Sequence, residues 1–175
     1  MPVKRKRQGR SPVILGWREW AALPELGVRS IKAKLDTGAR TSSLHAFKPR
    51  RFQRDGRPMI RFEIHPVQRS TASSIEVEAE VIEERVVRTS GGEAETRPVI
   101  RTTLQLGDRQ FAIELTLTRR DEMGFRMLLG REALRRRVVV DPARSFVLGD
   151  AGAARAARRA ASKSRRKAIT TGEDE

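Results

Sequence analysis

Hydrophobic and polar residues alternate one by one along four segments of this chain, and this pattern limits its fold more than any other feature. In the first segment Ile31, Ala33 and Leu35 alternate with lysines, and the same pattern recurs at 60–65, 75–81 and 111–117. A period of two places successive side chains on opposite faces of a β-strand, so each segment should bury one face and expose the other. Turn-forming residues separate the segments, at Asp55-Gly56, Ser90-Gly91-Gly92 and Gly107-Asp108. The pattern predicts an all-β fold, an antiparallel sandwich or barrel.

One apolar segment departs from the alternation. Met127-Leu128-Leu129 is a contiguous apolar run that Gly130 closes. Such a run is typical of a strand buried on both faces, which predicts a place in the centre of the fold. A short helix candidate follows at 131–135. We expect a last pair of strands at 138–140 and 146–148, separated by the turn Asp141-Pro142-Ala143-Arg144.

The chain has 175 residues and a formal net charge of +15. Its length suits one domain, expected at 12–150, between a basic N-terminal arm at 1–11 and an Ala/Arg-rich C-terminal tail at 151–175. A basic excess favours nucleic acid as a partner, but the arm and the tail carry nine of the fifteen charges. Contact with RNA or a ribosome is therefore expected through these ends. A disordered, solubilising role for the C-terminal tail is an equal alternative.

Several classes of protein are excluded at this stage. The chain has no cysteine, which rules out disulfide scaffolds, haem attachment and cysteine-rich zinc sites. No apolar run approaches the roughly 18 to 20 residues that cross a bilayer, and no signal-type hydrophobic stretch follows the basic N-terminus. We expect a soluble, cytoplasmic protein without a membrane partner.

The residue types also exclude several kinds of site. The sequence has no glycine-rich phosphate loop, no His-Glu-x-x-His zinc helix and no Gly-x-Ser-x-Gly elbow, and its two histidines, His45 and His65, lie in different segments. What remains is Asp36-Thr37-Gly38, at the end of the first alternating strand. A tight loop there can orient the carboxylate with hydrogen bonds and favour its ionised form. By itself the tripeptide could equally be an ordinary turn.

Longer strings give this tripeptide a context. They are 36–46 (DTGARTSSLHA), Leu117-Thr118-x-Arg120, Leu128-Leu129-Gly130-Arg131 and 140–146 (VDPARSF). Together they resemble the retropepsin-like aspartic proteases, and in particular the branch labelled RimK-associated or "ATP-dependent zinc" proteases. The resemblance covers about residues 12–150. It implies a closed, retropepsin-like (acid protease) barrel with one short helix, and aspartic peptidase activity. We expect no cofactor and no metal, since the residues offer neither a nucleotide loop nor a zinc site.

The resemblance also implies roles for individual residues. Asp36 would be the catalytic residue, and because the chemistry needs two carboxylates that share a proton, the second would be Asp36 of another copy in a two-fold homodimer. The residues that would support the active-site loop are Thr37, Gly38, Ala39 and Gly130. Gly91 and Gly92 would lie in a hairpin flap over the substrate, although an ordinary hairpin turn is an equal interpretation.

One position departs from the viral members of the family. An acid usually follows their Asp-Thr-Gly-Ala string and pairs with the arginine after the Leu-Leu-Gly-like segment; here that position is Arg40. An ion pair with Arg131 is then impossible, so both arginines would face the cleft and favour acidic peptides. This agrees with the implied partnership with RimK-type ligases, which add glutamates to a ribosomal protein. Two alternatives stay open: a catalytically silent module of the same fold that holds RNA, ribosomes or an acidic protein, and a zinc protease as the label says.

Overall fold

The computed structural model describes residues 11–67, 73–89, 91–119 and 124–149. The expected N-terminal arm, apart from Ser11, and the C-terminal tail lie outside these residues, as do Ser90 and Arg120. Over the described part the chain is all-β with one short helix, which confirms the predicted class. Its strands are β1 (Val13–Gly16), β2 (Arg18–Leu23), β3 (Val28–Leu35), β4 (Ser42–His45), β5 (Phe47–Arg54), β6 (Arg57–Ile64), β7 (Ile75–Glu80), β8 (Glu83–Arg88), β9 (Ala94–Leu106), β10 (Arg109–Thr118), β11 (Met127–Leu129) and β12 (Val138–Asp141), and the helix α1 is Arg131–Leu134.

Six strands close into a ring. They follow the order β10-β4-β11-β3-β2-β9, and β9 pairs back onto β10 along eight residues, from Leu106 opposite Arg109 to Val99 opposite Thr116. The core fills the inside of this ring and the space under the neighbouring sheet β5-β6-β7. No helix among the described residues is long and apolar enough to cross a membrane.

The alternating segments supply the core, as their pattern predicts. Ile31, Ala33 and Leu35 of β3 are buried. Other segments contribute Ile60, Phe62, Ile64, Val77, Val81, Ile113, Leu115 and Leu117. Burial of each large apolar side chain contributes about 1.5 to 3 kcal/mol relative to leaving it exposed. Met127 and Leu129 are fully buried, and β11 lies between β3 and β4, so the central place predicted for this run is confirmed.

The prediction of a purely antiparallel arrangement is wrong. β4 runs parallel to β10, β3 runs parallel to β11, and β1 runs parallel to β12. Parallel pairing needs a long connection between the two strands, and the members of each of these pairs lie far apart in the sequence. The alternation in the sequence reports which face is buried, but it carries no information about the direction of the neighbouring strand.

The expected strand at 146–148 does not form. Phe146 has a left-handed backbone, with φ of 52°, and the segment folds against the start of β2. Its amide groups bond elsewhere: the N–H groups of Val147 and Leu148 donate to the carboxylate of Glu19, which is fully buried. Because a side chain takes these donors, no strand partner is needed. The turn at 141–144 does form, and β12 pairs with β1 in place of the expected partner.

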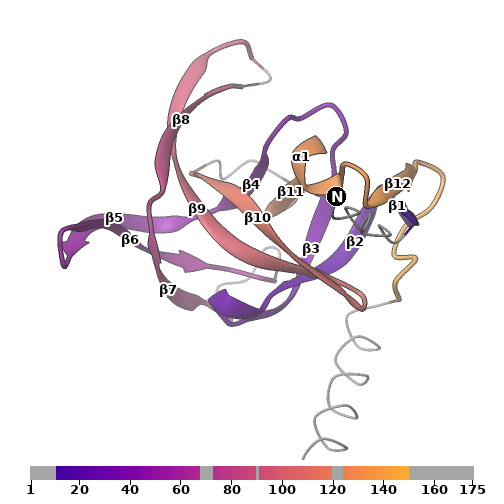
Figure 1. The fold of residues 1–175 in the computed structure, drawn as a ribbon, viewed down its shortest axis with the longest axis horizontal. Coiled ribbons are helices and arrows are strands. Elements are labelled where there is room, and N and C mark those ends of the chain that lie inside the picture. Colours follow the sequence, from indigo (N-terminus) through magenta and orange to yellow (C-terminus); the bar gives the residue numbers. More distant parts are fainter. Residues whose placement is uncertain (1–10, 68–72, 90, 120–123, 150–175) are drawn as a thin grey trace, which may run out of the picture.

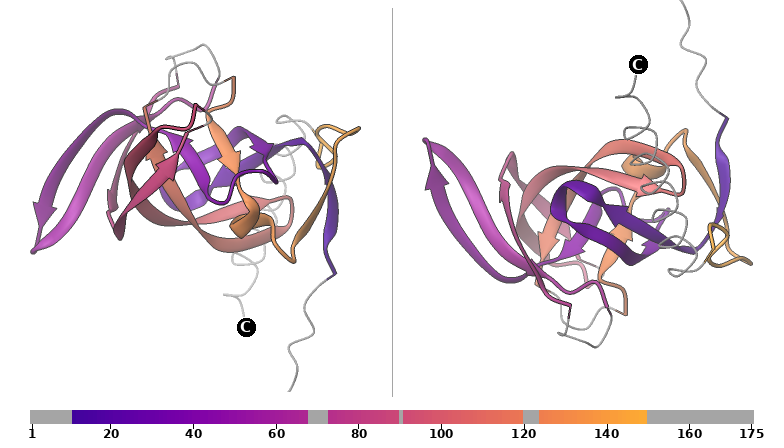
Figure 2. Two further views of the ribbon diagram at one scale, coloured as in Figure 1. Left: turned by 90° about the horizontal axis from the view of Figure 1, so that it is seen from above. Right: turned by 90° about the horizontal axis from the view of Figure 1, so that it is seen from below.

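Two hairpins extend from the ring. The β5–β6 hairpin projects sideways, on the left of Figure 1 and of both views in Figure 2. The β8–β9 hairpin rises on the same side of the molecule as α1 and the loop between β3 and β4 (Figure 1). That loop carries Asp36, so the ring brings the Asp-Thr-Gly segment and the predicted flap to one side of the molecule.

Candidate active site

The loop at 36–41 joins β3 to β4, and β11 holds both of its ends. β11 pairs parallel with β3, where Leu129 is opposite Leu35, and antiparallel with β4, where Leu128 is opposite Ser43. The N–H of Asp36 continues the ladder, since it donates to the carbonyl oxygen of Leu129 at 2.8 Å. The apolar run 127–129 therefore fixes the backbone from which the Asp36 side chain extends.

The loop orients the Asp36 carboxylate through its own backbone. Oδ1 accepts hydrogen bonds from the N–H groups of Gly38 at 3.0 Å and Ala39 at 3.1 Å. Oδ2 lies 3.9 Å from the ammonium group of Lys34, and 29% of the Asp36 side chain is exposed. One carboxylate oxygen is thus held by the loop, while the other faces a cation at the partly open surface.

Gly130 lies directly against this loop. A Cβ atom on Gly130 would lie 2.5 Å from the carbonyl oxygen of Thr41 and 2.9 Å from the carbonyl carbon of Arg40. Its φ of −84° suits any residue, so lack of space, and not backbone conformation, requires glycine. Its N–H donates to the Oγ of buried Ser42 at 3.0 Å. Ser42, which sequence reasoning missed, thereby ties the start of β4 to the end of β11.

Both arginines have partners within the chain, Arg131 two backbone carbonyl oxygens and Arg40 an acidic side chain. The guanidinium group of Arg131 donates to the carbonyl oxygens of Thr37 at 3.1 Å and Gly38 at 2.8 Å. Arg40 forms an ion pair with Glu132, with Nε and Oε1 2.9 Å apart. The ion pair between loop and helix is therefore present with its polarity reversed. Glu132 follows Arg131 directly in the sequence, and that acid was the signal that could have revealed it.

The β8–β9 hairpin carries the predicted flap glycines. Gly92 has a left-handed backbone with φ of 85°, and its N–H donates to the carbonyl oxygen of Thr89. The base of the hairpin is held by charges, since Arg85 forms ion pairs with Glu83 and with Glu114 of β10. Arg85 lowers the pKa of Glu114 from its ordinary value, with a smaller contribution from Arg101. On β8, Glu84 pairs with Arg51 of β5, so the hairpin is also tied to the neighbouring sheet β5-β6-β7.

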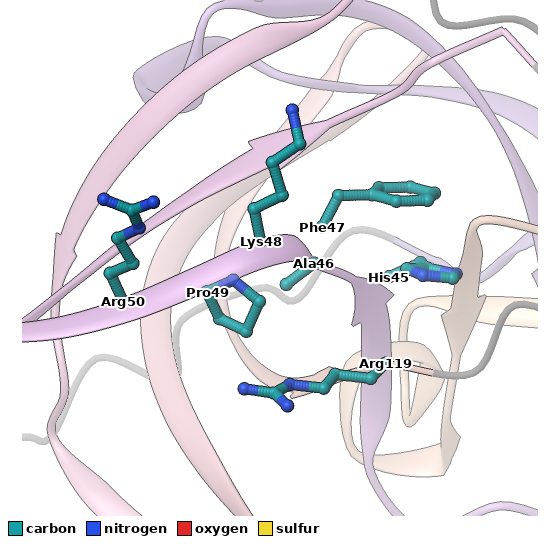
Figure 3. A pocket seen from close by; sticks show the side chains of 7 residues that line it. All are labelled: His45, Ala46, Phe47, Lys48, Pro49, Arg50 and Arg119. Atoms are coloured by element: carbon teal, nitrogen blue, oxygen red, sulfur yellow. The ribbon is translucent and has the colours of Figure 1, made fainter.

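Two cavities occur near these elements. One of about 370 Å³ lies between β10 and α1, and Ser42, Glu114 and Glu132 contribute to its walls. The other, of about 420 Å³, lies where β4 ends and β5 begins (Figure 3). In the described parts of the chain, no group of three histidine or acidic side chains could hold a metal ion together, so no metal ligand is assigned.

Comparison with known proteins identifies the family. The family model for RimB-like proteins, described as retropepsin-like aspartic endopeptidase RimB, matches residues 14–150. The chain belongs to the RimB-like family. This confirms the resemblance seen in the sequence and the retropepsin-like assignment of the fold.

The RimB-like chain also resembles longer proteins. It is 50% identical over 139 residues to a protein of Shewanella pealeana named probable alpha-L-glutamate ligase, covering 79% of this chain and 30% of that protein. A protein of the same name in Parasynechococcus marenigrum is 54% identical over 138 residues, with the same two coverages. The chain thus spans about 30% of the length of these relatives.

A solved structure shares the fold. It is the crystal structure of a Legionella pneumophila protein of unknown function, which matches with a TM-score of 0.66 and 32% sequence identity. The match covers 79% of the RimB-like chain and 99% of the Legionella protein.

Proposed function

We propose that this protein is an aspartic peptidase in which Asp36 of one protomer works with Asp36 of a second copy. The observation that carries the proposal is the carboxylate held by its loop, with Oδ1 fixed by two backbone amides and Oδ2 toward the surface. One such group is half of the catalytic pair that the chemistry needs. Membership of the RimB-like aspartic endopeptidase family supports the assignment.

In the proposed reaction the two carboxylates share one proton, because two close carboxylates cannot both ionise. The ionised Asp36 takes a proton from a water molecule, whose oxygen attacks the scissile carbonyl carbon. The protonated partner gives its proton to the carbonyl oxygen. When the tetrahedral intermediate collapses, the carbon–nitrogen bond breaks and the leaving amine takes the proton held by the first carboxylate. One hydroxyl of the intermediate returns its proton to the partner carboxylate, so the pair again shares one proton.

The loop is suited to a two-fold axis. Thr37 and Gly38 are exposed, while their carbonyl oxygens are held from behind by Arg131. The Thr37 side chain is therefore available to contact its symmetry mate. A Cβ on Gly38 would lie 3.2 Å from Oδ1 of Asp36, so glycine gives the carboxylate room. The β8–β9 hairpin would close over the bound peptide and exclude water.

For the substrate we propose acidic peptides, such as a glutamate-rich tail of a ribosomal protein. The side chain of Arg40 is 79% exposed, and an exposed ion pair such as that with Glu132 contributes only about 0 to 1 kcal/mol. A substrate carboxylate can thus compete for Arg40 at little cost. Relatives that contain a similar segment are named probable alpha-L-glutamate ligases, which supports glutamate as part of the substrate.

Subunit mixing tests the shared active site. Asp36→Asn should abolish peptide cleavage, whereas Asp108→Asn, a change of the same kind in the β9–β10 turn, should leave it unchanged. If equal amounts of wild-type and Asp36→Asn protein exchange subunits freely, about one quarter of the wild-type activity should remain, because only dimers with two aspartates work. A value of one half would mean that each Asp36 works independently, and three quarters would mean that one Asp36 per dimer suffices. Cleavage by Asp36→Asn itself at the wild-type rate would mean that Asp36 is not the catalytic residue.

Substrate preference needs a separate measurement. Glutamate-rich peptides should be cleaved faster than matched glutamine-rich peptides, and the difference should shrink as salt rises. Arg40→Ser should reduce this preference, while Arg144→Ser, which removes the same charge from the exposed turn after β12, should not. Equal rates for both peptides at all salt concentrations would refute the proposed preference for acidic substrates, but they would not contradict the proposed role of Asp36.

A further inference from the structure

A cationic pocket lies at the far end of β4 from the Asp36 loop. Its volume is about 420 Å³, and its walls come from the β4–β5 junction and from the residue after β10: His45, Ala46, Phe47, Lys48, Pro49, Arg50 and Arg119. β4 begins at Ser42, beside Gly130, and ends at His45, so the length of this strand, roughly 10 Å, separates the pocket from the catalytic loop. The pocket is therefore distinct from the proposed active site.

Positive charge dominates its described walls. Three of the seven lining residues are Lys48, Arg50 and Arg119, and none of the seven is an acid. Lys48 pairs with Glu63 of β6 at 2.8 Å. Arg50 and Arg119 are exposed, and no described residue forms an ion pair with either of them. Figure 3 shows Lys48 and Arg50 rising from the start of β5, with Arg119 on the other side of Pro49.

The backbone at this point is unusual. Lys48 has φ of 47°, a left-handed conformation uncommon outside glycine, and the β5–β6 register shifts between Phe47 and Arg50. A bulge of this kind turns side chains away from their regular direction, and bulges recur beside functional sites. Protection of an edge strand from aggregation would account for a lysine, a proline and a bulge in β5. It would not account for Arg119, which another strand brings to the same pocket.

The aromatic floor excludes one class of ligand. The Phe47 ring is parallel to the ring of His45, with centroids 4.0 Å apart, and to that of His65, at 3.8 Å. Two parallel rings this close must cover opposite faces of Phe47, so neither face can stack on a base. Proteins that bind single-stranded nucleic acid rely on such open ring faces. The pocket therefore suits anionic side chains better than nucleotides.

We propose that this pocket is a second binding site, which takes the carboxylate groups of an acidic polypeptide. Its cations lie on both sides of Pro49, so a ligand with more than one anionic group can contact cations on each side. An extended acidic peptide meets this requirement, since every second side chain lies on the same side, about 7 Å apart. Guanidinium groups bind carboxylates through paired hydrogen bonds. The site anchors an acidic chain whether or not Asp36 cleaves it.

The test measures binding in the absence of cleavage. A fluorescent hexaglutamate peptide is titrated into the full-length Asp36→Asn protein, alone and combined with Arg50→Ser, Arg119→Ser or both. Each single change should weaken binding on the order of fivefold, and the double change should weaken it more than tenfold. Arg144→Ser is the matched control, since it removes the same charge from a distant exposed turn. All variants should keep the unfolding temperature of the parent, because the changed side chains are exposed.

Two outcomes would overturn the proposal. If the pocket variants weaken binding no more than Arg144→Ser does, the peptide responds only to net charge. If they weaken binding of a single-stranded RNA oligonucleotide of equal charge but leave hexaglutamate unaffected, the pocket serves nucleic acid. Because binding is measured without a catalytic Asp36, either result is independent of whether the protein is a peptidase.

Discussion

Gly130→Ala should distort the Asp36 loop because of one added methyl group. The new Cβ would lie 2.5 Å from the Thr41 carbonyl oxygen, whereas ordinary contacts are 3.4 to 4 Å. The atoms that it meets belong to the backbone, so no flexible side chain can move aside. The loop must shift by about 1 Å, at an overpacking cost of about 1 to 3 kcal/mol. A displacement of that size at a catalytic group lowers activity roughly 100-fold.

The assay compares two glycine variants. For a domain of this size, 1 to 3 kcal/mol corresponds to a fall of about 3 to 10 °C in the unfolding temperature, which calorimetry can measure. Gly124→Ala is the control, because a Cβ there meets nothing within 4 Å and its φ is not left-handed. It should unfold and cleave like the wild type. If Gly130→Ala also retained the wild-type unfolding temperature and activity, the reasoning that the close packing of Gly130 on the loop is needed for stability and activity would be refuted.

Three further changes test other contacts. Arg131→Met should lower the free energy of unfolding by about 1 to 2 kcal/mol, because two loop carbonyls lose their donor; an unchanged denaturation midpoint would contradict this. Glu19→Gln should lower the free energy of unfolding by about 2 to 4 kcal/mol and speed amide exchange at Val147 and Leu148, because the buried Glu19 carboxylate accepts hydrogen bonds from three backbone N–H groups. Amide exchange at the wild-type rate would refute this prediction. Hydrogen bonds chiefly from Lys48, and then from His65, lower the pKa of Glu63 from 4.5 to about 2. The stabilisation that ionised Glu63 provides is therefore complete above about pH 4.5 and lost as the pH falls toward 2. Glu63→Gln should make the unfolding temperature depend less on pH over that range. An unchanged pH dependence would argue against this.

Local patterns in the sequence predict most of the fold. Each alternating segment reports its own buried face, because the two-residue period is a property of a single strand. The run at 127–129 also predicts its own place, since residues that are apolar on both faces need neighbours on both sides. The same run supports the Asp36 loop. The apolar pattern at 127–129 therefore predicts where that loop is held, although the run itself contains no proposed catalytic residue.

What could not be predicted depends on partners distant in the sequence. Strand direction is one example, and the segment at 146–148 is another. Val147 and Leu148 have the composition of a strand, but the carboxylate of Glu19 takes their amide groups. Nothing near residue 19 marks it as a partner for a segment more than a hundred residues later. The Arg40–Glu132 pair was missed for the same reason, since the choice between Arg131 and Glu132 as partner depends on how α1 is turned.

The place of β11 sets the order in which the site can be assembled. Residues 36–41 leave the ribosome some ninety residues before β11, the strand that fixes them from its place between β3 and β4. Until residues 127–130 have been synthesised and inserted, neither the Leu129 carbonyl nor Gly130 is present to define the loop. Contacts of such long range also make folding slow. A nascent chain therefore carries Asp36 without the loop geometry that orients its carboxylate, and that geometry arises only when synthesis of the domain is nearly complete.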